Sequence, residues 1–483
     1  MQQKVYRTTL LIWLFLAILL GLASCQVGVR IGEPWWALPL VGLIMAVSIK
    51  KSRLAVVVVA LLGGLLGAMQ GTAFLASVAS YKGFTDRKIQ VEGLVKEDPV
   101  FGKSGAKQFV IEEIAVTTDK GPLRLNGDLF ITTPSSPDIT RHDRVRVNGK
   151  LRDGFGPFQG SMSFAQVQVI AHEQHPFDLL RSRFAVGVTS VLPEPHASLG
   201  LGFVIGMKAS LPPDMNTALQ QLSLTHVVVA SGYNLTVLVR AAKKLREKQS
   251  RLQTLLLSLG LIATFLMITG NSPSMIRAGL VSGISLLAWY YGRQMQPLVA
   301  LLLVMAGTAF VYPPYLWGDI GWWLSFTAFA GILLVVPLVT TTFWPERPPP
   351  MLVQIAIEAF VAQLMTLPIT LLFFGNLSIL GLLANVVIVP LIPLAMLLVA
   401  IAGFTDLALP GVAAIVAIPA HAILALIVWI IFQMSAVPWA AIEVYIGPPA
   451  MVFWYALILL VLGLSWLKLS RQQREEALSR QIV

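Results

Sequence analysis

The stretch Leu224-Thr-His-Val-Val-Val-Ala-Ser-Gly-Tyr-Asn-Leu-Thr-Val-Leu-Val-Arg240 is the part of the chain around which the rest is organised. It is apolar enough to lie in a membrane, yet it carries a group of polar or helix-weakening residues: His226, Ser231, Gly232, Tyr233 and Asn234. Polar side chains at membrane depth are costly unless they face a cavity or a partner, and glycine weakens a helix by about 1 kcal/mol relative to alanine. We therefore predict a broken helix, which bilayers tolerate only where the backbone is covered by protein or lines water.

The composition around this stretch is that of an integral membrane protein. Of the 483 residues, 56% are hydrophobic and only 12% are charged, whereas soluble domains carry about 25% charged residues. The net charge of +11 fits basic cytoplasmic loops, or alternatively a basic path for a polyanion. The single cysteine, Cys25, excludes an internal disulfide. It follows Leu22-Ala-Ser, which is similar to a lipoprotein cleavage box, although an ordinary first membrane span explains it as well.

Apolar stretches occur on both sides of a polar region. Three precede it, at Thr8–Ser24, Trp35–Ile49 and Leu54–Ala76, and the third contains a Gly63-x-x-x-Gly67 spacing that favours close helix packing. A run rich in Lys and Arg extends from Arg240 to Arg251, and eight more apolar stretches follow it. They are expected at 252–270, 274–292, 296–312, 318–342, 351–374, 379–403, 411–435 and 450–467.

The polar region predicts a small β-barrel. Five strands with alternating patterns are expected at Ile89–Val95, Phe109–Val116, Leu123–Ile131, Val145–Leu151 and Phe164–Ile170. Five short strands in under a hundred residues favour an OB-like fold, which often binds single-stranded nucleic acid through cations and stacking aromatics. Basic and acidic residues nearly balance in this region, so a structural or partner-binding barrel is equally compatible with it.

The chain is thus expected to be an α-helical polytopic membrane protein with an inserted extracytoplasmic OB-like β-barrel. The expected parts are a three-span region (1–77), the β-domain (78–175), amphipathic or re-entrant helices (176–223), a multi-span domain (224–467) and a basic tail (468–483). Phe177–Leu192 predicts an interfacial helix with Asp178 and Arg181 on its polar face. Counting crossings with the first residue inside puts all strongly basic loops and both termini on the cytoplasmic side.

The second half resembles the ComEC-type competence family of DNA-uptake channels. The resemblance is carried by a set of motifs in order: Gly202-Phe-Val-Ile-Gly206, Leu224-Thr-His226, Ser231-Gly-Tyr-Asn234, Pro273-Ser-Met-Ile-Arg277, Asp319-Ile-Gly-Trp-Trp-Leu-Ser325-Phe326, Gln363, Thr366-Leu-Pro368 and Gly381-Leu-Leu-Ala-Asn385. Two departures from the family pattern matter. The family's central motif commonly ends in His where this chain has Asn234, which cannot titrate. The metallo-β-lactamase-like domain that many members carry at the C-terminus is expected to be lacking, because no His-x-His-x-Asp-His cluster occurs.

Several polar residues within apolar spans are candidates to line or gate a passage. They are His226, Ser231, Gly232, Tyr233, Asn234, Arg277, Asp319, Ser325, Gln363 and Asn385. Each also has a plainer explanation: helix breaking, interhelical hydrogen bonding, or an arginine that extends to the interface. A pair between Arg277 and Asp319 is a further alternative, which would satisfy both groups. A catalytic pair of His226 and Ser231 is disfavoured, because residues five apart do not share a helical face.

We therefore expect no enzyme, no cofactor and no metal site, but a channel in the bacterial cytoplasmic (inner) membrane that carries single-stranded DNA inward during natural transformation. No Gly-x-x-x-x-Gly-Lys-Ser/Thr loop occurs, so energy is expected from a cytosolic ATP-driven translocase. The other expected partners are an extracytoplasmic DNA receptor, single-strand-binding proteins, membrane lipids and a second copy of the chain. The alternatives are a secondary transporter of a smaller anionic solute and an intramembrane hydrolase.

Overall fold

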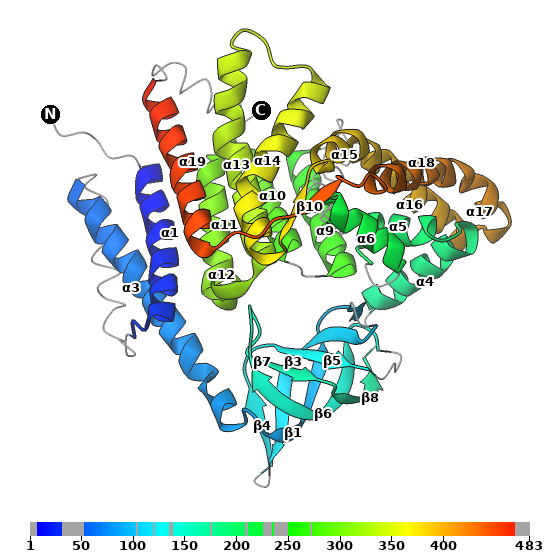
Figure 1. Cartoon of the computed structure of the whole chain (residues 1–483), viewed down its shortest axis with the longest axis horizontal. Coiled ribbons are helices and arrows are strands. Elements are labelled where there is room, and N and C mark those ends of the chain that lie inside the picture. The colour runs from blue at the N-terminus through cyan, green and yellow to red at the C-terminus, as the bar shows by residue number, and fades with distance from the viewer. Residues whose placement is uncertain are drawn as a thin grey trace. The chain divides into compact units, whose positions relative to one another are not determined.

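The structure is a computed structural model that describes residues 7–30, 53–102, 105–118, 121–134, 139–173, 176–207, 211–225, 234–235, 250–270 and 273–468. The chain divides into two compact units, and Figure 1 labels their helices and strands. The first combines Met1–His175 with Leu298–Trp322, and the second combines Pro176–Pro297 with Trp323–Val483. Each unit is thus assembled from two separate parts of the sequence.

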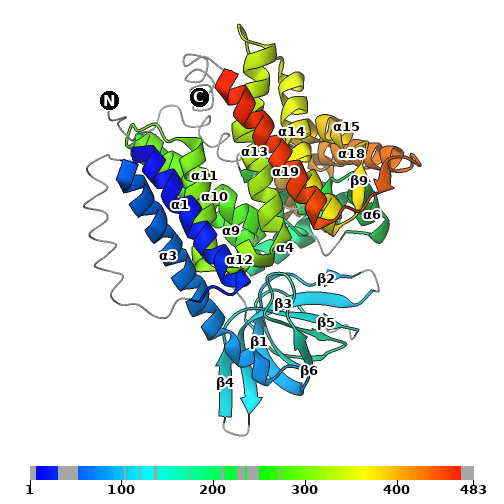
Figure 2. The ribbon, with the colours of Figure 1, turned by 60° about the vertical axis from the view of Figure 1, so that its left-hand side comes forward.

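Two long helices, α1 (Arg7–Ser24) and α3 (Arg53–Ser77), lie side by side in the first unit (Figure 2). Their glycines explain how close they come. A Cβ atom on Gly67 would lie 2.1 Å from the backbone oxygen of Ile18, and one on Gly21 would lie 2.0 Å from that of Gly64. The predicted close packing through the Gly63-x-x-x-Gly67 spacing is therefore confirmed. Cys25 is buried, and its thiol donates to the backbone oxygen of Ala68 at 3.2 Å.

Two shorter helices from much later in the chain complete this unit. They are α11 (Pro297–Val311) and α12 (Pro314–Gly318). The indole nitrogen of Trp317 donates to the backbone oxygen of Leu22 at 3.0 Å, and Gln70 Nε2 donates to that of Phe310 at 2.9 Å. These bonds attach the α11–α12 segment to the helix pair formed by α1 and α3.

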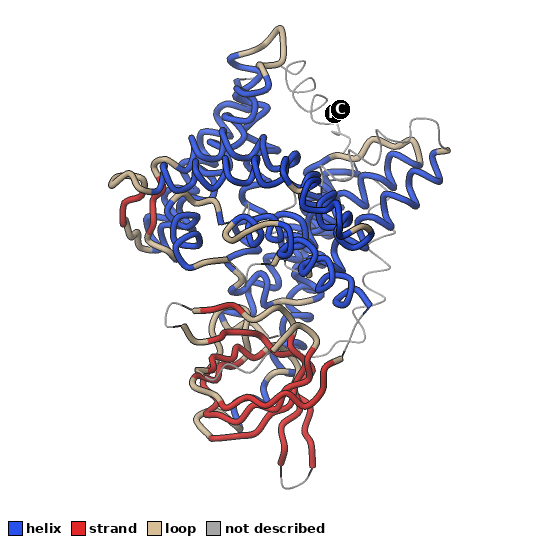
Figure 3. The backbone as a smooth tube through the Cα atoms, turned by 90° about the vertical axis from the view of Figure 1, so that its right-hand side faces the viewer, coloured by secondary structure: helices blue, strands red, loops and turns tan. Residues whose placement is uncertain are grey.

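Five of the eight strands of the first unit form a closed barrel (strands are red in Figure 3). Its members, in spatial order, are β1 (Lys88–Val95), β3 (Lys107–Thr118), β5 (Leu129–Thr133), β7 (Gly160–Ser163) and β6 (Asp143–Asp153), which pairs back with β1. All these pairings are antiparallel except that of β5 with β7. Along β6, Val145, Val147 and Leu151 point into the core, while the residues between them face outward. The predicted small barrel is confirmed, with the strand number of an OB-fold.

One of the five expected strands was wrong, and another is a strand that lies outside the closed barrel. The run Leu123–Ile131 is not one strand, because a turn with Gly127 at φ 106° separates β4 (Gly121–Leu125) from β5. The run Phe164–Ile170 corresponds to β8 (Gln166–His172), which pairs with β6 outside the closed ring. The fifth barrel strand is β7, a four-residue segment that the sequence analysis did not identify. Strand β2 (Val100–Phe101) is also short and pairs only with β3.

The second unit is helical. Its described helices are α4 (Pro176–Val191), α5 (His196–Ile205), α6 (Pro213–Gln221), α9 (Arg251–Thr269), α10 (Pro273–Tyr290), α13 (Ile320–Phe343, whose first turn belongs to the other unit), α14 (Met351–Phe373), α15 (Gly381–Ile388), α16 (Ile392–Ala408), α17 (Pro410–Val416), α18 (Ile418–Ser435) and α19 (Pro448–Lys468). Two short strands, β9 (Asn376–Ser378) and β10 (Ala441–Glu443), pair antiparallel and connect loops far apart in sequence.

A single large core joins α4, α5, α6, α15, α16 and α18. Phe184 and Val188 of α4 are buried in it, as the apolar stripe predicts. Arg181, which was expected on the polar face of an interfacial helix, is also buried, with 6% of its surface exposed. The reason is that α4 packs against α16, whose Gly403 leaves space close to Phe184. The assignment of Arg181 to an exposed polar face was therefore wrong.

Eight helices among the described residues are long and apolar enough to cross a membrane. Two of them precede the polar region, and six follow Arg251: Arg251–Thr269, Ile320–Phe343, Met351–Phe373, Gly381–Ala408, Ile418–Ser435 and Pro448–Ser465. The expected span at 296–312 is the 15-residue helix α11, which is shorter than the roughly 20 residues a crossing needs. The expected span at 274–292 contains α10, which is not among the eight, and Trp35–Ile49 lies outside the described residues. The chain is a multi-pass membrane protein.

Candidate functional site

The side chain of Arg277 lies between two helices whose sequences set its position. Helix α10 begins at Pro273, a residue that favours the first helical position because it has no N–H to leave unbonded. Arg277 is therefore one turn into α10, on the same face as Ser274. Helix α13 starts at Ile320, and Asp319 Oδ1 accepts a hydrogen bond from the backbone N–H of Trp322 at 2.7 Å, which caps the helix.

Hydroxyl groups and aromatic rings surround the Arg277 guanidinium. Its Nε donates to Ser325 Oγ at 2.5 Å, and Ser325 Oγ in turn donates to Ser274 Oγ at 3.2 Å. The guanidinium carbon lies 5.2 Å from the ring centre of Phe329 and 6.0 Å from that of Phe326. Such distances allow cation–π attraction. The residues Ser325, Phe326 and Phe329 all belong to α13, so this helix provides most of the surroundings.

The charge on Arg277 has no carboxylate counterpart among the described residues. The structure records no ion pair for it there, and it records one hydrogen bond from its five N–H donors. Arginine stays protonated in proteins, and a charge at membrane depth is expected to meet a partner. The uncharged hydroxyl and ring contacts hold the guanidinium in place without neutralising it. This arrangement leaves a fixed positive charge with donors still available to an anion.

Asp319 has a structural role at the start of α13. Its carboxylate accepts the Trp322 N–H, and the structure records no ion pair for it among the described residues. The sequence is compatible with an Arg277–Asp319 pair. The recorded partners of the two side chains are a cap for Asp319 and a hydroxyl for Arg277.

The other predicted residues have partners of their own where they are described. Asn234 is fully buried, and its Nδ2 donates to the backbone oxygen of Phe203 in α5 at 3.1 Å. Gln363 Nε2 donates to the backbone oxygen of Ser378 in β9 at 3.0 Å. Asn385 Nδ2 donates to Gly381, within its own helix, at 2.9 Å. The bonds of Asn234 and Gln363 connect separate parts of the second unit, whereas that of Asn385 is local. The remaining residues of the central motif (His226, Ser231, Gly232 and Tyr233) lie outside the described residues.

The structure brings Arg277 and Ser325 together, although they are 48 residues apart. Both residues are candidates from the sequence, but their contact and the part played by Ser274 and Phe329 are visible only in the structure. The three-residue spacing of Ser274 and Arg277 was the available signal, because it places both on one face of a helix. Nothing in the sequence indicates which face of α13 meets α10.

A second polar cluster lies in the first unit, between the barrel and the α11–α12 segment. Asp128 accepts from Lys96 Nζ at 2.7 Å and from the Tyr312 hydroxyl at 3.0 Å. Burial alone would lower the pKa of Lys96, but the charges of Asp128 and Glu112 outweigh it, and the pKa is raised above its ordinary value. The cluster thus keeps a charged pair within the barrel, and the hydrogen bond from Tyr312 to Asp128 attaches the barrel to a segment 184 residues later in the chain. No sequence motif pointed to it.

No group of three or more His, Cys, Asp or Glu side chains in the described parts of the chain is arranged to hold a metal ion. Only Cys25 could supply a thiolate, and it is buried between helices. The candidate site therefore consists of the Arg277 cluster and the surrounding polar side chains of the second unit.

Comparison with known proteins assigns this region to a family. The model of the Competence protein family matches residues 203–469, which include Asn234, the whole Arg277 cluster, Gln363 and Asn385. The chain belongs to the competence protein family. The resemblance found in the ordered motifs is thereby confirmed.

One relative of this competence family member is the ComE operon protein 3 of Bacillus subtilis (strain 168), to which the chain is 27% identical over 237 residues. The matched region is 48% of this chain and 29% of the relative, so less than a third of the relative's length is covered. No solved structure matches the chain.

Proposed function

We propose that this protein is a channel that carries single-stranded DNA across the cytoplasmic membrane during natural transformation. The observation that carries the proposal is the Arg277 cluster: a positive charge without a carboxylate partner among the described residues, inside the region that matches the competence family. Membership of that family gives the biological setting, and the charge gives a means of attracting the substrate.

The physical argument starts from the charge of the substrate. Single-stranded DNA carries one negative charge per nucleotide, and an apolar passage would exclude it. Arginine binds phosphate oxygens through parallel N–H groups. Ser325 occupies only one donor of Arg277, so a passing phosphate can be bound by the others and then released. A carboxylate partner would neutralise the charge and remove this advantage.

Further residues are proposed to line or gate the same passage. They are His226, Ser231, Gly232, Tyr233, Asn234, Asp319, Ser325, Gln363 and Asn385. We also propose that the barrel and its surroundings face the outside, where a DNA receptor would deliver the strand, and that both termini face the cytoplasm. A cytosolic ATP-driven translocase would supply energy, single-strand-binding proteins would receive the strand, and two copies of the chain could assemble.

Uptake measurements in a strain lacking the gene test this proposal. Cells complemented with Arg277→Gln should take up labelled DNA at a rate reduced about tenfold or more, because a charge-assisted hydrogen bond contributes about 1.5–3 kcal/mol. Arg277→Lys should retain part of the rate, since the charge remains. Arg293→Gln, an exposed arginine in the loop after α10, is the matched control. Normal uptake and transformation in the deletion strain would overturn the channel proposal.

Short and interrupted helices favour one alternative, a secondary transporter for a smaller anion. Helix α15 has eight residues, and α16 follows it through the 3-10 turn Val389–Leu391. Transporters often place such interruptions at their binding sites. The two functions differ in the deletion strain: a transporter of small anions predicts normal DNA uptake and a defect in growth on the anion.

A further inference from the structure

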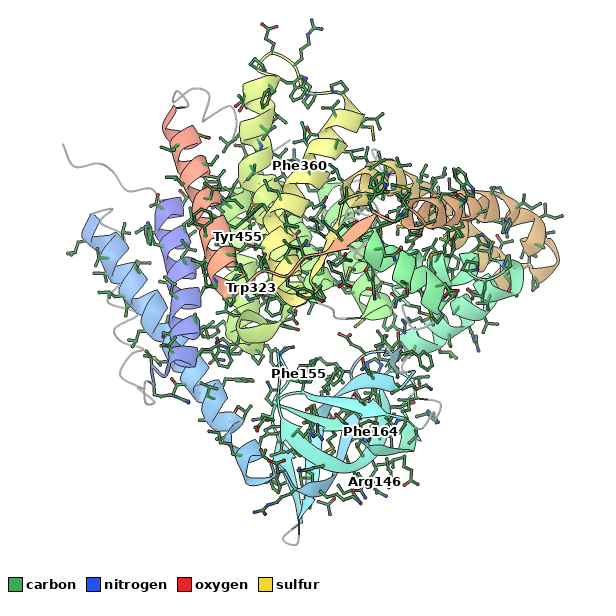
Figure 4. The ribbon with its side chains drawn as sticks, viewed as in Figure 1. Arg146, Phe155, Phe164, Trp323, Phe360 and Tyr455 are labelled. Carbon is green, nitrogen blue, oxygen red and sulfur yellow. The ribbon has the colours of Figure 1, made fainter. Side chains whose placement is uncertain are left out.

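An open hollow of about 390 Å³ lies on the outer surface of the barrel, where β1, β6 and β8 are neighbours. Most of its lining residues have polar side chains, and the ring of Phe164 stands at the turn between β7 and β8 (Figure 4). The lining residues are Asp86, Lys88, Asn148, Gly149, Lys150, Ser163, Phe164 and Gln166. The functional site in the second unit makes no use of this surface.

Phe164 has a conformation that packing does not explain. Its φ angle is 56°, in the left-handed region where a bulky side chain is a genuine outlier. Its side chain is also 81% exposed, so the ring gains little from burial in the folded chain. Glycine or asparagine would adopt the same backbone at lower cost. An aromatic ring held out into solvent at a strained position indicates a ligand that stacks on it.

The groups beside Phe164 are suited to a nucleotide. Lys88 and Lys150 lie directly opposite each other on β1 and β6, an arrangement of like charges that is destabilising without an anion between them. Lys150 pairs with Asp86 at 2.8 Å, whereas the structure records no ion pair for Lys88 among the described residues. Asn148 and Gln166 are also direct partners, on β6 and β8. No hydrogen bond of either side-chain amide is recorded in the described chain, so both can donate and accept.

We propose that this hollow binds one nucleotide of single-stranded DNA, with the base stacked on Phe164, its edge contacted by Asn148 and Gln166, and a phosphate held by Lys88. The inference rests on the proposed function, since it names a DNA-binding site outside the membrane region. The outer face of β6 continues the surface with Arg146 and Arg152. Alternate residues of a strand are about 6.7 Å apart, so the strand presents a polar or cationic group at regular intervals.

The carboxylates on this face do not prevent the proposed binding. Asp86 is paired with Lys150, and Glu92 is paired with Arg146 at 2.7 Å. The Asp86–Lys150 pair is solvent-exposed, with 75% of the Asp86 side chain accessible, and the Glu92–Arg146 pair is partly exposed. Exposed pairs contribute little to stability, so the cations can exchange a carboxylate for a phosphate at little cost. Lys88 and Arg152 have no recorded ion pair among the described residues, so these two cations need no exchange.

The test uses the full-length protein in nanodiscs and a fluorescent 20-residue oligothymidylate, with binding followed by anisotropy. Phe164→Gly should weaken binding about fivefold or more, the effect expected from loss of one base–aromatic stack, while the melting temperature stays the same or rises because strain is relieved. Phe164→Trp should bind at least as well as the wild type. Phe101→Ala, an exposed phenylalanine on β2 outside the hollow, is the matched control and should bind normally.

Two more measurements identify the contacts. An oligonucleotide of equal length without bases should bind wild type and Phe164→Gly equally, because it cannot stack. Lys88→Gln should reduce the slope of log affinity against log salt concentration by about 0.7, the value for one phosphate contact on a single strand.

Unchanged oligothymidylate binding by Phe164→Gly would overturn the proposal. So would wild-type protein that binds no oligonucleotide, even if Phe164→Gly lowered transformation, since the ring would then serve a protein partner. Normal transformation of the deletion strain would instead reject the channel function and leave the binding result to stand alone.

Discussion

At the residue scale, Ser325 gives Arg277 a hydrogen-bond acceptor that carries no charge. The 2.5 Å contact fixes the guanidinium, and the rings of Phe326 and Phe329 lie beside it. The sequence indicated that Arg277 is important, because an arginine in an apolar run needs an explanation. It did not indicate the partner, since helix spacing determines which residues share a face but not which face meets another helix.

A substitution that neutralises Arg277 in place tests the importance of its charge. Ser325→Asp puts a carboxylate next to the guanidinium, so an ion pair should form. We expect the protein to be expressed and folded at wild-type levels while DNA uptake falls about tenfold or more, the size of effect expected from loss of one charge-assisted bond. Ser325→Ala leaves the charge and should keep most of the uptake. Equal uptake by Ser325→Asp and the wild type would show that the charge is not used.

Tyr312 offers a prediction about stability. Its hydroxyl donates to Asp128 at 3.0 Å, and hydrogen bonds to charged groups contribute about 1.5–3 kcal/mol. Tyr312→Phe should therefore lower the free energy of unfolding by about that amount, measured by thermal denaturation in detergent. Tyr291→Phe, at a tyrosine that is 71% exposed, should have no effect. A Tyr312→Phe protein as stable as the wild type would mean that water replaces the hydroxyl.

The pKa of Lys96 sets the pH range of the same cluster. Because this pKa is raised, the stabilising contribution of the Lys96–Asp128 pair is complete below the unfolded-state pKa of about 10.4. It is lost only as the pH rises through the folded-state pKa. The destabilisation caused by Lys96→Met should accordingly be the same at pH 7 and pH 9 and should shrink above that range. A difference between pH 7 and pH 9 would contradict the assigned cause.

At the element scale, the α1–α3 pair shows what glycines do in close helix packing. Gly67→Val would place a side chain 2.1 Å from the backbone oxygen of Ile18, where only a shift of a whole helix can relieve the clash. We expect detergent-solubilised Gly67→Val to aggregate at a lower temperature than the wild type in size-exclusion assays. Gly260→Val in α9, where nothing lies within 4 Å of the added Cβ, is the control and should behave normally. Identical behaviour of the two variants would exclude a packing role for Gly67.

The elements differ in how well the sequence predicted them. The strands β1, β3 and β6 were predicted because inward and outward residues alternate along them. Strand β7 was missed, because Gly160-Ser-Met-Ser163 is too short and too polar to show alternation. Its membership depends on neighbours from β5 and β6. The long helices were predicted from apolar length alone. The shorter α11 was predicted to be a membrane span, because an apolar stretch only slightly shorter than a full crossing cannot be distinguished from a span by its length.

At the scale of the whole molecule, each compact unit is built from two sequence segments. The segment Leu298–Trp322 belongs with the barrel and α1–α3, not with its neighbours in the chain. Composition changes along the sequence can mark a polar domain, as they do for the β-domain expected at 78–175. Composition does not indicate which later apolar segment packs against an earlier part of the chain, because the apolar helices have similar compositions.

The membrane topology can be tested with single cysteines in a Cys25→Ser background. Arg124→Cys lies at an exposed position on β4, and Glu346→Cys lies in the exposed loop between α13 and α14. With the barrel outside and that loop inside, a membrane-impermeant maleimide should label the first in intact spheroplasts and the second only after permeabilisation. Labelling of both positions in intact spheroplasts would place them on the same side and contradict the topology that basic loops predict.

The bond between Asp128 and Tyr312 also has a consequence for synthesis on the ribosome. The two residues are 184 positions apart, and chains grow at about 5–20 residues per second. The ribosome therefore adds Tyr312 roughly ten to forty seconds after it has added Asp128. During that time Lys96 can already pair with it, since Lys96 precedes it in the chain. The nascent barrel thus keeps its buried carboxylate compensated until translation delivers the helix that completes the unit.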